Sequence, residues 1–69
     1  MISKKFARTV IEHWVETGSA YVTKKYYYYG KYDRVNGWIE VRRVCPTEDK
    51  DFAALVAVYR MGKGWLICG

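Results

Sequence analysis

Few side chains in this sequence have the types and spacing that catalysis or metal binding requires. His13 is the only histidine, and no nearby serine or cysteine forms a nucleophile and base pair with it. Glu48, Asp49 and Asp51 form the one acidic cluster, but Lys50 lies inside it and the glycine spacing of a calcium loop is absent. We interpret His13 as a helix-boundary residue and the cluster as a solvated turn. We therefore predict no catalytic residue, no cofactor and no metal site, and no enzymatic activity.

The two cysteines, Cys45 and Cys68, have no metal-binding spacing, since a CxxC pair is absent. Neither lies at a helix N-terminus that would activate it as a nucleophile. We expect two reduced, mostly buried thiols in a cytoplasmic protein, and a single Cys45–Cys68 disulfide stays open.

The sequence offers no segment for a membrane. The longest apolar run, from Phe52 to Tyr59, is far shorter than the ~20 residues that span a bilayer. Lys4, Lys5 and Arg8 interrupt any apolar run near the start, so we expect no signal peptide and no membrane partner.

The segment Lys24–Tyr32 holds five tyrosines and three lysines in nine positions. Successive side chains of a strand point to opposite faces, so Tyr26 and Tyr28 share one face and Tyr27 and Tyr29 the other. We expect the first pair in the core and the second pair outside, beside lysines. Exposed Tyr, Trp and basic side chains can stack on bases and meet phosphates, or they can form the centre of a protein interface.

The positive charge is uneven along the chain. The net charge is +5, and residues 1–45 carry nine Lys/Arg against four Asp/Glu, whereas residues 46–69 carry three of each. A positive surface favours association with nucleic acid or with an acidic protein patch.

The first segment predicts a helix from about Lys4 to Thr17. Apolar side chains recur there at helical spacing, and they are Phe6, Ala7, Val10, Ile11 and Trp14. Ser3 is a suitable N-cap, and Gly18 can adopt the left-handed conformation that ends a helix. We expect Trp14 to be largely buried.

The next segment predicts strands, because residues 20–29 are rich in aromatic and β-branched side chains, with Gly30 as a break or bulge. Asn36-Gly37 is a strong hairpin signal. A two-residue turn would place Asp33 opposite Glu40, both negative, so we predict a four-residue loop from Arg34 to Gly37 that places Lys31 opposite Glu40.

This register separates two faces of the hairpin. The core face is predicted to hold Tyr28, Tyr32, Ile39 and Val41. The other face is predicted to hold Tyr29, Lys31, Asp33, Trp38, Glu40 and Arg42.

The last segment fits two structures. As a helix it has Thr47 as N-cap and Gly62 as stop; as a hairpin it has strands on either side of residues 61–64. We favour the hairpin, because the strand at residues 65–67 needs a neighbour. The predicted fold is therefore a single small α+β domain, residues 1–69, with one N-terminal helix on an antiparallel sheet of about four strands. The alternative has a second helix at about 48–61.

These features predict a small stand-alone binding protein. Its binding surface is predicted to comprise Lys25, Tyr27, Tyr29, Lys31, Trp38, Arg42 and Arg43, with Lys25 and Arg43 at the margins. The first choice of partner is a protein complex that handles nucleic acid. The alternative is nucleic acid itself, although no residue string matches a zinc finger, an RNA-recognition motif or a GXXG loop. A homodimer is also left open.

In size and composition the chain resembles stand-alone accessory proteins of phages and mobile elements, including small anti-CRISPR proteins. The resemblance covers the whole chain, and no motif carries it. It implies an inhibitor that acts in the cytoplasm of a bacterial host cell.

Overall fold

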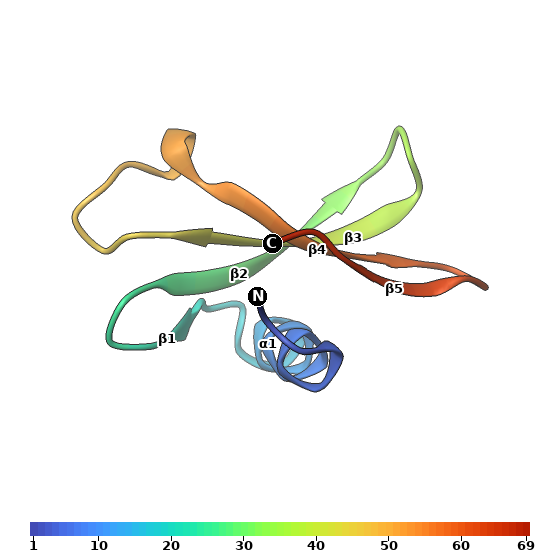
Figure 1. Cartoon of the computed structure of the whole chain (residues 1–69), viewed down its shortest axis with the longest axis horizontal. Coiled ribbons are helices and arrows are strands. Elements are labelled where there is room, and N and C mark those ends of the chain that lie inside the picture. Colours follow the sequence, from blue (N-terminus) through green and yellow to red (C-terminus); the bar gives the residue numbers. More distant parts are fainter.

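The chain folds as one helix against a five-stranded antiparallel sheet, seen in a computed structural model that describes all residues 1–69. The strands follow one another across the sheet in sequence order, β1-β2-β3-β4-β5. Figure 1 shows α1 alone on one face of the sheet, with no helix of comparable size on the other. The elements are α1 (Lys4–Thr17), β1 (Tyr21–Val22), β2 (Tyr27–Asp33), β3 (Trp38–Val44), the short 3₁₀ turn η1 (Lys50–Phe52), β4 (Ala54–Arg60) and β5 (Gly64–Ile67).

Helix α1 begins and ends where the sequence predicts. The hydroxyl of Ser3 accepts a hydrogen bond from the Phe6 N–H at 3.0 Å, which satisfies one of the free donors at the helix start. Gly18 has a φ of 70°, and its N–H donates to the Trp14 carbonyl, so the left-handed residue closes the last turn. The α+β class is confirmed, with five strands in place of about four. Neither helical segment has the length and apolarity that crossing a membrane requires.

The core lies between α1 and the sheet. Ala7 and Val10 of the helix are fully buried, and Phe6 packs edge-on against Tyr28 with ring centroids 4.9 Å apart. The cluster of buried side chains comprises Ala7, Val10, Tyr28, Val41, Val56 and Ala57. The register shift between Val41 and Arg42 leaves Val56 of β4 without a partner in β3, as the extra residue of a bulge, and both Val56 and Ala57 belong to this cluster.

Gly30 allows the helix to approach the sheet. A Cβ at this position would lie 2.5 Å from Cε3 of Trp14, a separation that real side chains do not adopt. The prediction that Gly30 breaks or bulges the strand is wrong, because β2 runs through it without interruption. The break falls instead at residues 23–26, where the Thr23 N–H donates to the Tyr26 carbonyl, and it creates the additional strand β1.

One aromatic side chain is less buried than the sequence predicts. Trp14 is largely though not completely buried, as predicted, and its ring covers Gly30 at the margin of the sheet. Tyr32 shares the helix-facing side with Ile39, as predicted, but it is 57% exposed. Tyr32 lies two residues further along β2 than Gly30, the point of contact with Trp14.

The β2–β3 register is confirmed. Lys31 lies opposite Glu40, and Asp33 lies opposite Trp38 across a four-residue loop. The Asp33 carboxylate accepts hydrogen bonds from the backbone N–H groups of Val35 and Asn36 and from the Asn36 side-chain amide at 2.7 Å. These hydrogen bonds all lie within residues 33–36, so they stabilise the loop locally.

The C-terminal segment is a hairpin, as favoured, and the alternative helix at about 48–61 is wrong. Only the single turn η1 is helical there. Strand β4 pairs with β3 on one side and with β5 on the other, so both of its edges are satisfied. A helix would have left the outer edge of β3 and the last strand without partners.

Gly30→Ala should destabilise the protein by about 1–3 kcal/mol, the usual cost of forcing an extra methyl group into a packed contact. Urea denaturation followed by circular dichroism measures this cost. In a Trp14→Leu background the same substitution should cost clearly less, because the obstructing ring is gone. An equal cost in both backgrounds would contradict the contact as its cause.

The hydrogen bond from the Asn36 side-chain amide, together with the backbone N–H donors of the loop, lowers the pKa of the Asp33 carboxyl below its ordinary value of 3.8. Because the folded-state pKa is the lower one, the resulting stability is present above about pH 3.8 and is lost as the pH falls through the folded value. An NMR titration of the carboxyl carbon should show this low pKa. Asn36→Ala should raise it, whereas Val35→Ala, which keeps its N–H donor, should leave it in place.

Candidate functional site on the helix-free face of the sheet

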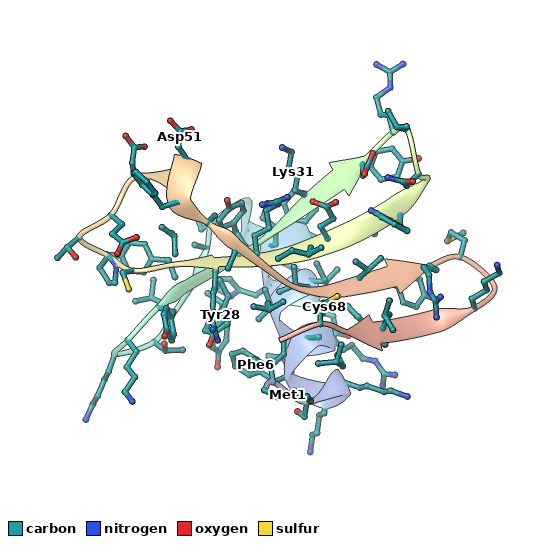
Figure 2. The ribbon with its side chains drawn as sticks, turned by 45° about the horizontal axis from the view of Figure 1, so that its top comes forward. Met1, Phe6, Tyr28, Lys31, Asp51 and Cys68 are labelled. Carbon is teal, nitrogen blue, oxygen red and sulfur yellow. The ribbon has the colours of Figure 1, made fainter.

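The face of the sheet opposite α1 carries the side chains that the sequence marks for binding. The β2–β3 register places alternate residues of both strands on this side, and Val58 and Leu66 continue it across β4 and β5. Figure 2 shows Lys31 and Asp51 pointing away from the side that holds Phe6, Tyr28 and Met1. We call this surface the helix-free face, and it comprises Tyr27, Tyr29, Lys31, Asp33, Trp38, Glu40, Arg42, Val44, Leu55, Val58, Arg60 and Leu66.

A buried carboxylate organises the centre of the helix-free face. Glu40 is only 7% exposed, although no second layer covers it. Its Oε1 accepts a hydrogen bond from Arg42 Nε at 3.0 Å, and its Oε2 accepts one from Trp38 Nε1 at 3.1 Å. Arg42 Nη1 also donates to the carbonyl of Ala53, at 3.4 Å. The network satisfies both carboxylate oxygens and fixes the Trp38 and Arg42 side chains.

The same network decides which charges remain free. Arg42 and Glu40 form the single ion pair in the chain. Lys31 lies opposite Glu40 but forms no ion pair with it, and it is exposed. The basic character of the helix-free face therefore rests on Lys31, on Arg60 opposite Trp38 in the register, and on Lys50 of η1, whose ammonium lies 5.5 Å from the centre of the Tyr29 ring.

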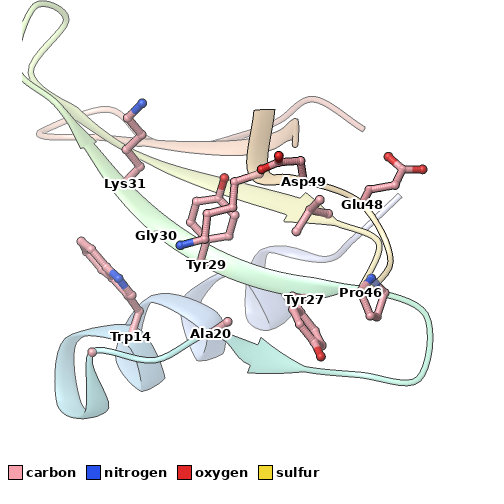
Figure 3. A pocket seen from close by; sticks show the side chains of 12 residues that line it. Trp14, Ala20, Tyr27, Tyr29, Gly30, Lys31, Pro46, Glu48 and Asp49 are labelled. Carbon is pink, nitrogen blue, oxygen red and sulfur yellow. The ribbon is translucent and has the colours of Figure 1, made fainter. Parts of the chain in front are cut away.

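A groove of about 650 Å³ runs beside β2 at the margin of this face. Figure 3 shows Trp14 entering it from α1, while Tyr29 and Lys31 stand on the opposite side of β2. Its lining comprises Trp14, Gly18, Ala20, Tyr27, Tyr29, Gly30, Lys31, Val44, Pro46, Glu48, Asp49 and Lys50. Positive and negative side chains therefore share one concave surface with three aromatic rings.

The structure brings together most of the predicted binding residues. Five of them share the helix-free face, and they are Tyr27, Tyr29, Lys31, Trp38 and Arg42. Lys25 is exposed in the turn between β1 and β2. Arg43 lies on the opposite side, beside Tyr28 in the register, with its guanidinium 4.5 Å from the centre of the Tyr26 ring.

The sequence marked the acidic loop as a solvated turn and did not predict that it would lie beside the tyrosines. Pro46, Glu48 and Asp49 lie between β3 and η1 and line the groove, although they are distant in sequence from the tyrosines. Their exposure agrees with a solvated turn. They reach the site because the loop folds beside β2, and no local sequence pattern predicts this contact.

The remaining candidates for chemistry lie elsewhere. His13 packs edge-on against Tyr21 with ring centroids 5.5 Å apart. Both cysteines are unpaired, which settles the open disulfide, and Cys68 is exposed, contrary to the expectation of a buried thiol.

Comparison with protein-family models, with curated proteins and with solved structures finds no match to this chain. The function must therefore be inferred from the geometry of the site and the charges around it. The two features that bear on function are the groove, which carries both positive and negative side chains, and the helix-free face beside it.

Glu40→Ala should destabilise the protein by about 1–3 kcal/mol, because Trp38 and Arg42 would each lose a charge-assisted hydrogen-bond partner. Chemical denaturation measures the change. The exposed helix residue Glu16 provides a control, and Glu16→Ala should change the stability by no more than about 0.5 kcal/mol. Equal effects of the two substitutions would contradict a structural role for the network.

Proposed function

We propose that this protein is a small non-enzymatic binding protein that docks on a protein partner through the helix-free face and its groove. The observation that carries the proposal is that Trp38 and Tyr29 stay partly exposed beside a fixed, fully hydrogen-bonded Glu40. Trp38 is held in place by its bond to Glu40 and therefore loses little conformational entropy on binding, and Trp, Tyr and Arg dominate the energetics of protein interfaces.

The distribution of charge supports a protein partner over nucleic acid. Glu40 already pairs with Arg42, and Glu48 and Asp49 line the same groove as Lys31. A phosphate backbone lying along the groove would meet these carboxylates. The other cations are spread over α1, the turns and both sides of the sheet, so they do not form a continuous basic track.

The class of partner that we propose is a protein complex that handles nucleic acid, with this chain as a cytoplasmic inhibitor of the anti-CRISPR type. This part of the proposal rests on the small size and the net charge of +5, which favours encounter with acidic surfaces. The two unpaired cysteines are consistent with a reducing compartment.

The test is partner capture from nuclease-treated lysate of the source cells. Trp38→Ala and Tyr29→Ala should each weaken capture by at least about tenfold, because each removes a large side chain from the proposed interface. Tyr32→Ala is the matched control, since Tyr32 is an exposed aromatic residue of the same strand that points to the other face. Circular dichroism confirms that each variant folds.

Two outcomes would overturn this proposal. One is undiminished capture by both folded variants. The other is submicromolar binding of random-sequence DNA or RNA whose affinity falls steeply with salt. On duplex DNA each phosphate contact contributes about −0.9 to the slope of the logarithm of the affinity against the logarithm of the salt concentration.

A further inference from the structure

Strand β2 has an outer edge that is only partly covered. Strand β1 pairs with Tyr27 and Tyr28 and extends no further. From Tyr29 to Asp33, β2 therefore has β3 on one side and no strand on the other. An open edge of this kind is a template for a further strand.

The backbone groups that face this open edge can be identified. In an antiparallel ladder the N–H and C=O groups of successive residues point to alternate sides. The Thr23 N–H donates to the Tyr26 carbonyl, so Tyr26 and Tyr28 point their backbone groups toward β1. By the same alternation, the backbone N–H and C=O groups of Gly30 and Tyr32 point away from β3, beyond the end of β1.

These outward groups have no partner within the chain. None of the hydrogen bonds outside the regular elements involves the backbone of Gly30 or Tyr32, and no side chain bonds to either. Gly30 is nevertheless buried, at the floor of the groove beneath Trp14. Buried backbone groups in native proteins are almost always paired, so an occupant of the groove would satisfy the Gly30 N–H and C=O, while those of the exposed Tyr32 are free to pair as well.

We propose that an extended segment of the partner protein adds to β2 as a further strand, hydrogen-bonded to Gly30 and Tyr32. The inference rests on the proposed function and specifies how the docking takes place. The groove provides room beside Tyr29, Gly30 and Lys31, with Trp14 on the helix side and Lys31 on the helix-free side (Figure 3), and the strand continues past the groove to the exposed Tyr32. Strand addition obtains affinity from main-chain bonds and specificity from alternate side chains.

The chemistry of the incoming segment follows from the two sides of the groove. On the helix-free side, its residue beside Lys31 should be acidic, because Lys31 is exposed and has no ion pair. On the helix side, the neighbouring residue should be apolar, because it would lie against the incompletely buried ring of Trp14 beside Gly30.

A second copy of this chain is a poorer occupant. The symmetric pairing that uses the whole free edge, from Tyr29 to Asp33, is centred on Lys31 and places it opposite its own copy. That position is a non-hydrogen-bonded pair, with Cα atoms only about 4.5 Å apart, and like charges there are destabilising. An acidic segment of a different protein removes this repulsion and replaces it with attraction.

The direct test uses three capped eight-residue peptides in which Val alternates with Thr around a central Glu, Gln or Lys. Each is titrated to millimolar concentration into the ¹⁵N-labelled protein. The amides of Gly30 and Tyr32 should become protected from hydrogen exchange, whereas those of Tyr29 and Lys31, which already face β3, should not change. The Glu peptide should bind at least about threefold more tightly than the Lys peptide, and Lys31→Glu should reverse that order. Absence of protection at Gly30 and Tyr32 with all three peptides would overturn the proposal.

A backbone substitution separates strand addition from side-chain docking. Tyr32→Pro removes an N–H that does not take part in the β2–β3 ladder, so the fold should survive, as proline is tolerated at such edge positions. It should abolish protection by the Glu peptide and lower partner capture at least about tenfold, while Tyr32→Ala, which keeps the N–H, preserves both. Capture that is lost in Trp38→Ala but unchanged in folded Tyr32→Pro would leave the proposed function standing and overturn strand addition. A concentration-dependent dimer that Tyr32→Pro dissociates would also overturn it, in favour of a second copy.

Discussion

The contact between Trp14 and Gly30 is the constraint on which the arrangement of this molecule depends. The indole ring lies so close to the strand that no side chain fits between them. This contact holds the last turns of α1 against β2, and Ala7 and Val10 complete the packing nearer the start of the helix. Because the ring covers the margin of the sheet, it also forms one wall of the groove. One packing interaction thus sets how closely α1 approaches β2 and shapes the groove of the candidate site.

On the helix-free face, the hydrogen bonds of Glu40 hold neighbouring side chains in position. Val58 is 2% exposed and Glu40 is 7% exposed on a face that has no covering layer. Neighbouring long side chains must therefore exclude water from them, and the bonds from Trp38 and Arg42 to Glu40 hold two of these side chains in position. A buried carboxylate is costly unless it is fully hydrogen-bonded, so the network is a condition for the stability of this face.

The sequence predicted the elements that depend on local chemistry. Ser3 and Gly18 mark both ends of α1 correctly, and the charges of Lys31, Asp33 and Glu40 identified the loop length and the register of the β2–β3 hairpin. The sequence did not reveal features that depend on contacts between distant segments. Gly30 is a packing contact for Trp14 and does not break the strand. The division of the tyrosine-rich segment into β1 and β2 depends on the turn that Thr23 forms with Tyr26. The position of Glu48 and Asp49 beside the tyrosines also depends on contacts between distant segments, so the sequence did not reveal it.

The uncovered parts of the sheet are the features on which the binding proposal rests. Helix α1 contacts β1, β2 and β3, and its buried side chains cluster with Val56 and Ala57 of β4, so the single long helix covers one face of the five-stranded sheet. The chain has no second helix to cover the other face, and β1 is too short to cover the edge of β2. Aromatic rings on the helix-free face and backbone groups at the outer edge of β2 therefore lack a covering layer. In the proposed strand addition, a strand and an acidic residue of the partner would cover these groups, so the uncovered edge of the sheet and the proposed docking surface are the same feature.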